Sequence, residues 1–438
     1  MNKSWSDSIY QKLINEEDAR ACKAIDDDAC REVPGNFMRI IISQFLTNLG
    51  DAIINPKVTL PWILQSLGAP AFLLGWLVPI RESGSLIPQL AIASWIRKMP
   101  LRKWAWVTGS ILQALCVLAI GLVAMTLEGA VAGWAVIGLL AVFSLSRGLS
   151  SVASKDVLGK TIPKKQRGQV SGWSSSAAGF VTIAMAAALF LSWYLNADSG
   201  NAFYGWALIA GAAIWLLAAG VFAQVKEFPG ETSGGKNGLS EAFKQLALLK
   251  TDKDFRNFVI TRSLFLCTAL SAPYYIVLAH DALGSDIWVL ALFMFASGLA
   301  GLVSAPVWGR FSDQSSRRVM MMASMGAAVI GTLLFLISEY LPQLMSTFWL
   351  MPLLYFLLTI CHQGVRVGRK TYLVDMAEGD KRTSYVSVSN TMIGIILLAL
   401  SAVGSLTSVM SIETLILAFS VMAVVGVLMA ARLPEVSE

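Results

Sequence analysis

The 438-residue sequence is poor in charge. Asp, Glu, Lys and Arg make up only 14% of it, whereas hydrophobic residues make up 55%, and the mean hydropathy is +0.63. A soluble domain carries about 25% charged residues, so this composition indicates a membrane protein. The hydrophobic runs are continuous rather than alternating, which excludes a transmembrane β-barrel.

Signatures of several other functions are also missing. There is no GxxxxGKS/T phosphate-binding loop, so we do not expect ATP-driven pumping by this chain. The two histidines, His280 and His362, lie in no recognisable catalytic motif, which argues against a membrane enzyme such as an acyl or lipid transferase. The five cysteines lie in the N-terminal tail or in apolar runs, so no disulfide framework, metal site or cofactor is expected. The first apolar run begins near Phe37, so no signal peptide is expected.

Twelve apolar runs are present, each long enough to cross a hydrocarbon core of about 30 Å as a helix. They lie near residues 37–66, 70–96, 104–126, 131–155, 169–195, 202–225, 255–280, 287–310, 319–338, 346–370, 384–410 and 413–431. The sequence therefore predicts an all-α integral membrane protein with twelve transmembrane helices. The predicted domains are an N-terminal tail with a candidate surface helix (1–36), a six-helix bundle (37–225), a linker (226–254), a second six-helix bundle (255–431) and a C-terminal tail (432–438).

The loops between these runs alternate in charge. Basic residues gather near positions 97–103, 160–167, 310–318, 381–382 and 432. The intervening loops contain no Lys or Arg, and they carry Glu128, Asp198, Asp281, Asp286, Glu339 and Glu413. By the positive-inside rule, we expect both termini and the linker in the cytoplasm, and the protein in the plasma membrane, the inner membrane of a bacterium. The basic residues follow the loops rather than one face, so nucleic acid is not an expected partner despite the formal charge of +6.

The two bundles carry related basic landmarks. Residues 309–318 read GRFSDQSSRR, and residues 94–103 read SWIRKMPLRK. A shift of 215 residues (317 − 102) aligns their final basic pairs, and the same shift aligns Arg167 with Arg382 (382 − 167). Two landmarks at one offset predict a duplicated chain.

With this duplication, the chain resembles the major facilitator superfamily (MFS) of secondary transporters, without matching one subfamily. The family motif between helices 8 and 9 has a Gly, an acid four residues later, and a final basic pair. This sequence keeps these positions as Gly309, Asp313, Arg317 and Arg318. The loop 163–168 also resembles the family's loop between helices 4 and 5. The resemblance implies an MFS fold, and a gating motif made of these four residues together with Arg167.

Asp313 is predicted to act as a gate latch at the start of helix 5. There it would face the free N–H groups at Gly168–Gln169, where a helix N-terminus favours an anion. The first bundle has Lys98 in the place of this acid, so only one of the two pseudo-symmetric latches is expected.

Ionisable residues inside the predicted spans are the candidates for a substrate or coupling-ion site. Each costs at least about 2.5 kcal/mol in hydrocarbon and therefore needs a partner, a water-filled cavity or a role. They are Asp51, Lys57, Arg81, Glu82, Arg147, Arg262 and Arg366. They lie on helices 1, 2, 4, 7 and 10, and the resemblance implies that helices 1, 4, 7 and 10 line a central cavity.

These candidates have an excess of positive charge, with five cations and two acids (5 − 2 = +3). Arginine suits carboxylate or phosphate, so an organic anion or zwitterion is the favoured solute. Asp51 and Glu82 are candidate carriers of a coupled proton. Alternatively, the acids pair permanently with Lys57 and Arg81, while other arginines reach the membrane surface. His362 is expected to be a hydrogen-bonded helix residue.

The predicted function is transport of a small solute by alternating access, coupled to a proton or sodium ion, by a monomer in the lipid bilayer. A proton-coupled drug or metabolite efflux antiporter is the alternative, although helix 5 (171–191) lacks the proline of the antiporter motif. A membrane enzyme and a transporter-like sensor are alternatives of other classes.

Overall fold

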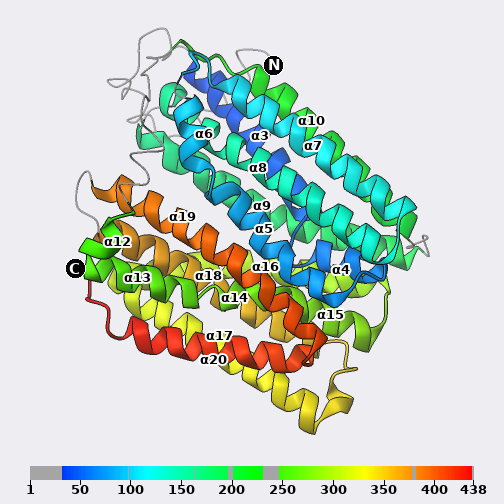
Figure 1. Cartoon of the computed structure of the whole chain (residues 1–438). Helices are drawn as coiled ribbons and strands as arrows, with labels where there is room; N and C mark the ends of the chain where they lie inside the picture. The colour runs from blue at the N-terminus through cyan, green and yellow to red at the C-terminus, as the bar shows by residue number, and fades with distance from the viewer. Residues whose placement is uncertain are drawn as a thin grey trace.

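The computed structural model describes residues 32–96, 98–162, 164–195, 201–229, 246–376 and 381–436 (Figure 1). Within these ranges all regular structure is helical. Figure 1 shows two groups of roughly parallel helices, one above the other. We call them the N half (α3 to α10) and the C half (α12 to α20).

The N half runs back and forth across the molecule. Its elements are α3 (Val33–Ile53), α4 (Thr59–Ser66), the 3-10 turn η3 (Ala71–Leu73), α5 (Leu74–Leu86), α6 (Gln89–Ile96), α7 (Lys103–Thr126), α8 (Gly129–Thr161), α9 (Lys164–Tyr194) and α10 (Asn201–Ala223). Helix α7 packs between α8 and α10, and α10 also packs on α3.

The C half has the same general course. Its elements are α12 (Leu248–Thr251), α13 (Lys253–Leu264), α14 (Cys267–Leu270), α15 (Ala272–Leu283), α16 (Ile287–Gln314), α17 (Ser316–Tyr340), η4 (Pro342–Leu344), α18 (Leu350–Met376), α19 (Lys381–Ser401), η5 (Ala402–Ser408) and α20 (Ile412–Ala430). Helix α17 packs between α18 and α20.

Nine helical segments of the described residues are long and apolar enough to cross a membrane. The other three predicted spans differ for visible reasons. The first, α3, is long enough, but its polar residues lower its hydropathy, and it ends at a break at residues 54–58 that contains Pro56. The second is broken beside Pro88. In α9, the apolar segment Gly179–Tyr194 is too short to be counted as a membrane-crossing helix. Twelve spans therefore remain a prediction, whereas an all-helical membrane architecture is observed.

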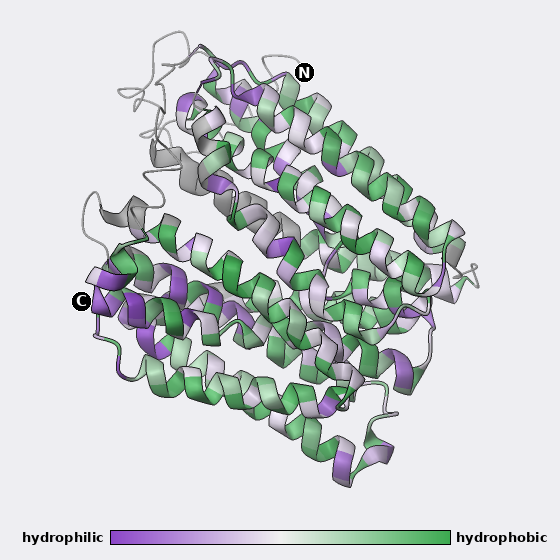
Figure 2. Cartoon of the chain, in the orientation of Figure 1, coloured by the Kyte–Doolittle hydropathy of each residue, from purple (hydrophilic) through white to green (hydrophobic). Residues whose placement is uncertain are grey.

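The lipid-facing surface is apolar. Figure 2 shows the outer helices α7, α10, α17 and α20 as mostly hydrophobic along their length. Large apolar side chains on these helices are exposed, among them Leu115, Leu217, Val329 and Leu428. In water such a surface would cause aggregation, whereas in a bilayer it is solvated by acyl chains.

The two halves meet more closely at one end than at the other. Helix α3 begins and helix α20 ends at the same end of the molecule, which we call the tail end; the opposite end is the far end (Figure 1). One cluster of buried apolar residues, which includes Trp62, Tyr275 and Leu415, spans both halves. Toward the tail end each half has its own separate cluster, around Phe222 in the N half and Phe258 in the C half. The halves are therefore joined in the far part of the molecule and separate toward the tail end.

A glycine pair allows the closest approach at the far end. Gly75 of α5 lies against Gly404 of η5, and a Cβ on Gly404 would come within 2.7 Å of the Gly75 Cα and of the Phe72 carbonyl oxygen. Beside them, the Gln65 side-chain amide donates a hydrogen bond to Asp281 in the C half at 2.9 Å. The far end is therefore closed by direct backbone packing and a polar contact between the halves.

Candidate functional site

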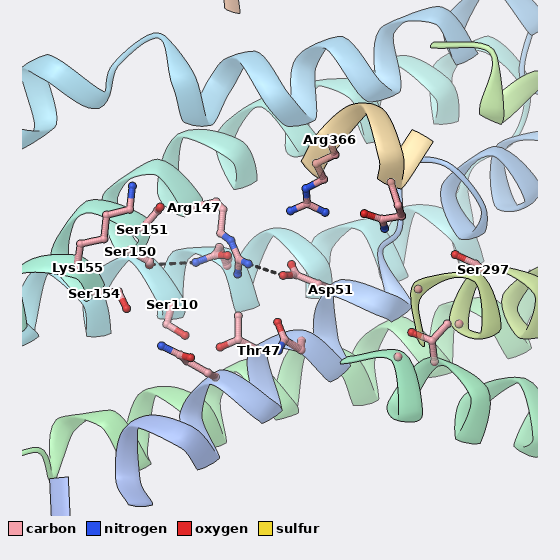
Figure 3. Close-up of a pocket in the computed structure, with 18 of the residues that line it drawn as sticks. Thr47, Asp51, Ser110, Arg147, Ser150, Ser151, Ser154, Lys155, Ser297 and Arg366 are labelled. Atoms are coloured by element: carbon pink, nitrogen blue, oxygen red, sulfur yellow. Dashed lines mark hydrogen bonds and ion pairs between the residues drawn. The ribbon is translucent and has the colours of Figure 1, made fainter. Parts of the chain in front are cut away.

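A cavity of about 850 Å³ lies between the two halves (Figure 3). Its walls come from α3, α7, α8 and α9 of the N half, and from α16 and α18 of the C half. Polar side chains line much of it, although the surrounding helices are largely apolar. A space of this size, built from both halves, is large enough to hold a small organic molecule.

The polar lining follows helical spacing. On α3 the lining residues are Gln44, Thr47, Asn48 and Asp51, and on α8 they are Arg147, Ser150, Ser151, Ser154 and Lys155. Residues three, four and seven apart share one face of a helix, so each series forms a single stripe facing the cavity. Helix α7 adds Ser110 and Gln113, whose amide donates a hydrogen bond to Ser150 at 3.1 Å.

Small residues shape the opposite wall. Gly179 of α9 lies against α16, where a Cβ on Gly298 would come within 3.1 Å of the Gly179 carbonyl oxygen. These two helices pack together across the boundary between the halves. Their small side chains leave room in the cavity, and α18 fills part of it with Gln363, Arg366 and Lys370.

Asp51 joins two arginines at the inner end of the α3 stripe. Its Oδ1 accepts a hydrogen bond from Arg81 of α5 at 3.1 Å, and its Oδ2 accepts one from Arg147 of α8. All three side chains are half-buried, with exposed fractions of 15–24%. The Arg81 guanidinium also lies over the Phe143 ring, 5.0 Å from its centre. One carboxylate is therefore shared by two permanently charged guanidinium groups.

The rest of the lining is cationic. Figure 3 shows Arg366 projecting from α18 into the space facing Asp51 and Arg147. Within the described part of the chain, no hydrogen bond or ion pair joins its guanidinium to another side chain. Among the described residues, the lining carries four cationic side chains, those of Arg147, Lys155, Arg366 and Lys370, and one carboxylate, that of Asp51, which gives a net charge of +3 (4 − 1).

Lys57 has a partner in the other half. It lies in the break between α3 and α4, and its Nζ is 2.8 Å from Nε2 of His362 on α18. The His362 Nδ1 is in turn 3.0 Å from the Thr268 hydroxyl. Glu82 is exposed, and its charge acts on Lys57 without a direct contact. His362 is thus hydrogen-bonded, as expected from the sequence.

Arg262 is not among the described residues that line the cavity. It is buried in the C half, where its guanidinium donates hydrogen bonds to the Ser389 hydroxyl at 2.6 Å and to the Asn390 side-chain oxygen at 3.0 Å. These contacts tie α13 to α19. These two partners on α19 could not be predicted from the sequence, because Ser389 and Asn390 lie far from Arg262 in the chain.

Comparison with known proteins gives the family. The sequence model of the Major Facilitator Superfamily matches residues 40–305 and 281–438, which together cover nearly the whole chain. The chain belongs to the major facilitator superfamily. It is therefore a multi-pass membrane transporter rather than an enzyme.

Solved structures of MFS transporters share this fold at low sequence identity. A D-xylose-proton symporter superposes with a TM-score of 0.68 at 12% identity, covering 92% of this chain and 98% of its own. A POT family transporter in complex with a thioalcohol-conjugated peptide gives 0.68 at 10% identity, covering 90% and 94%. The nucleoside transporter NupG gives 0.67 at 12% identity, covering 91% and 99%. No curated protein matches the chain in sequence. At these identities the likeness concerns the fold alone.

The MFS motif lies at the tail end of the C half. Gly309 is on α16, which ends at Gln314, and the Ser315 hydroxyl caps α17 by accepting from the Arg318 N–H at 3.2 Å. Arg317 pairs with Glu435 at 3.3 Å and donates to the Leu433 carbonyl oxygen at 2.7 Å. This basic residue therefore ties the start of α17 to the segment after α20.

The proposed latch needs a correction in its geometry. Helix α9 begins at Lys164, four residues before the predicted Gly168. Only the first four N–H groups of a helix are free, so Gly168–Gln169 lies beyond the favourable position for an anion. The side chains of Asp313 and Arg167 lie outside the described part of the structure.

The N half has an analogous contact that sequence reasoning missed. Glu227, just after α10, has a fully buried side chain. Its carboxylate accepts hydrogen bonds from the backbone N–H of Arg102 at 3.1 Å and of Lys103 at 2.7 Å, and from Lys160 Nζ at 3.0 Å. An acid after the last helix of each half thus binds the start of that half's third predicted span, where a helix N-terminus favours negative charge.

The polar stripes of the cavity were also missed, although the sequence contains their signal. Serines and amides carry no charge, so a search for charges alone passes over them. Their spacing of three and four residues on α3 and α8 would have identified one face on each helix.

Proposed function

We propose that this MFS transporter moves a small organic anion through the central cavity by alternating access. The observation that carries the proposal is the charge of the cavity lining, where the described residues include four cations (Arg147, Lys155, Arg366 and Lys370) and one carboxylate. A low-dielectric cavity with a net charge of +3 is strongly stabilised by a bound anion. A cation would meet repulsion from the same groups.

The pairing of Asp51 favours an anion over a zwitterion. A zwitterion needs an acid for its ammonium group as well as a cation for its carboxylate. Asp51, the single acid among the described lining residues, already accepts from both Arg81 and Arg147. Arg366 keeps its donor groups available, and a guanidinium binds a carboxylate or phosphate with two parallel hydrogen bonds.

Arg147 can take part by exchanging partners. Its guanidinium is 24% exposed and borders the cavity, so an anion there can compete with Asp51 for its donor groups. Arg81 would retain Asp51 during this exchange. Arg366 from the C half and Arg147 from the N half would then hold one solute between them, which links solute binding to the approach of the two halves.

The mechanism of movement follows from the two-part core. With the far end closed by Gly75 and Gly404 and the clusters separate at the tail end, this form would load or release solute at the tail end. The basic loops favour a cytoplasmic tail end in the bacterial inner membrane. Rocking of the halves about the cavity would then expose it to the other side.

Two alternatives are less well supported. Efflux of a lipophilic cation would require acids in the lining, and Asp51 is occupied by two arginines. A sensor that binds without transport would share the same cavity, so only a transport measurement separates it from a transporter. Proton coupling is compatible with either direction of transport.

A binding screen on purified protein tests the anion proposal. The probes are monocarboxylates, dicarboxylates, phosphate esters, amino acids and quaternary ammonium ions, each followed by its effect on the melting temperature. We expect stabilisation by one class of anion. Arg366→Gln should weaken binding of that anion by about 10- to 100-fold, since a charge-assisted contact contributes about 1.5–3 kcal/mol.

The matched control is Arg256→Gln, because Arg256 is an exposed residue of α13 outside the cavity. It should bind the anion as the native protein does. Stabilisation by cations and not by anions, or an unchanged anion affinity in Arg366→Gln, would contradict the proposal.

A further inference from the structure

A chain of hydrogen bonds crosses the boundary between the halves at the inner end of the cavity. Lys57 Nζ of the N half lies 2.8 Å from His362 Nε2 of the C half. His362 Nδ1 lies 3.0 Å from Thr268 Oγ1, and Thr268 Oγ1 donates to the Phe265 carbonyl oxygen at 3.0 Å. The next residue, Gln363, already lines the cavity. The chain therefore lies where the cavity stops and the closed far part begins.

The partners at the two ends of this chain determine its hydrogen positions. The Thr268 hydroxyl has one hydrogen, which it donates to Phe265, so its oxygen accepts from His362. The hydrogen of the neutral imidazole is then on Nδ1, and Nε2 carries a lone pair. Lys57 has only donors when charged, and it donates to that lone pair. With a charged Lys57, the contact between the halves thus requires a neutral His362.

We propose that His362 is the site of a coupled proton, and that this proton and the Lys57 ammonium group compete for the same lone pair on Nε2. A proton on Nε2 turns the acceptor into a donor and gives the ring a positive charge. Two donors and two like charges cannot share a 2.8 Å contact. Proton binding and the closed contact of the halves therefore exclude each other.

The surrounding charges complete the site. On α5 there is Glu82, whose charge acts on Lys57, and on α18 itself there are Arg366 and Arg369. Helix α14 contributes the neutral Thr268 and a buried Cys267. When Lys57 leaves His362, Glu82 of its own half is the acid that can receive it. An anion bound at Arg366 would add negative charge next to His362 and favour its protonation.

Because Lys57 and the proton exchange at Nε2 as the halves move, the proton would pass from the far side to the cavity. In the form with an open far end, Lys57 withdraws and a proton from the far-side water binds Nε2. As the far end closes, Lys57 returns to Nε2 and displaces the proton, which leaves for the water of the cavity. Each cycle that binds a proton in the open form and displaces it during closure moves one proton across the membrane. This inference rests on alternating access but not on the nature of the solute.

The first test measures the distance between the halves without any substrate. Spin labels are placed at the far end on exposed Val131 of α8 and Val409 before α20, in a chain whose five native cysteines have been replaced. Between pH 8 and pH 5.5 we expect the population with an open far end to rise at least about threefold, since one bound proton can shift it by up to tenfold per pH unit. His362→Gln, whose amide can still accept from Lys57, should remove this response.

The second test observes the imidazole directly. His280→Gln leaves His362 as the single histidine, so its ¹⁵N signals are unambiguous. At pH 8 we expect the Nδ1–H tautomer, and in Lys57→Gln we expect His362 to take up its proton at a pH at least about one unit higher. His280→Gln alone should keep the pH response of the spin labels.

Two results would overturn the proposal. One is an unchanged pH response in folded His362→Gln protein. The other is a His362 that carries hydrogen on Nε2 at pH 8 while the far end is closed. Neither result bears on anion binding, which is measured separately with Arg366→Gln.

Discussion

At the scale of single residues, the site depends on how charge is balanced across helices. Asp51 offsets Arg81 and Arg147, whereas Arg366 has no such partner among the described residues. Their charge inside predicted spans made Asp51, Arg147 and Arg366 candidate site residues in the sequence, and the structure places all three in the cavity lining. Their partners could not be predicted, because Lys57 and His362 are 305 residues apart and pairing across that distance leaves no local pattern.

Removal of the Asp51 charge should have opposite effects on stability and binding. Asp51→Asn leaves two arginines side by side without an acid, so we expect the free energy of unfolding to fall by about 1–3 kcal/mol, less than for a fully buried pair because the cavity is wet. The freed Arg147 should bind an anion more tightly. Chemical denaturation and anion titration measure the two effects.

Asp51→Asn combined with Arg147→Gln provides the control. Loss of one positive charge should recover part of the stability while removing the gain in anion affinity. Equal loss of stability in the single and double variants would show that the pair does not balance charge.

At the scale of elements, breaks and glycines determine how the halves meet. The sequence predicted most of the long apolar helices, because a run of about 20 apolar residues is a strong signal. It did not predict that α3 and α4, or α13 and α15, are separate helices. Such breaks depend on prolines such as Pro56 and on tertiary partners, and Lys57 and Thr268 lie beside two of them.

The Gly75–Gly404 contact should control closure of the far end. Gly404→Val would drive a side chain into the Phe72 carbonyl oxygen and the Gly75 backbone, which cannot yield without separation of η3 and η5. We expect labels on Val131 and Val409 to report a larger open population, with the melting temperature lowered by a few degrees. Gly138→Val, where a Cβ meets nothing within 4 Å, should leave the distances unchanged.

Asp313 is expected to hold the tail end shut when the far end opens. Asp313→Asn should shift the population further toward forms open at the tail end, because the form with a closed tail end loses about 1–3 kcal/mol of stabilisation. Anion affinity should stay within a few-fold of the native value. Labels on exposed Trp104 and Arg432 at the tail end measure the shift. An unchanged distribution would remove Asp313 from the gate.

At the scale of the whole molecule, the chain is an MFS transporter with a cationic cavity between its halves. The duplication was predicted from the sequence, because basic residues mark corresponding loops of each half at one offset. The identity of the solute could not be predicted from such a sequence pattern. It depends on which lining charges remain unpaired, and that follows only from the packing of α3, α8 and α18.

The most direct test of the account is counterflow in proteoliposomes. Vesicles are loaded with the anion that stabilises the purified protein and diluted into its labelled form, for native protein, Arg366→Gln and the exposed control Arg256→Gln. The account predicts accumulation by native protein and Arg256→Gln, and at least about tenfold slower exchange by Arg366→Gln, which lacks the contact that offsets the anion's desolvation. Exchange of only neutral or cationic solutes, or exchange at native rates by folded Arg366→Gln, would contradict it.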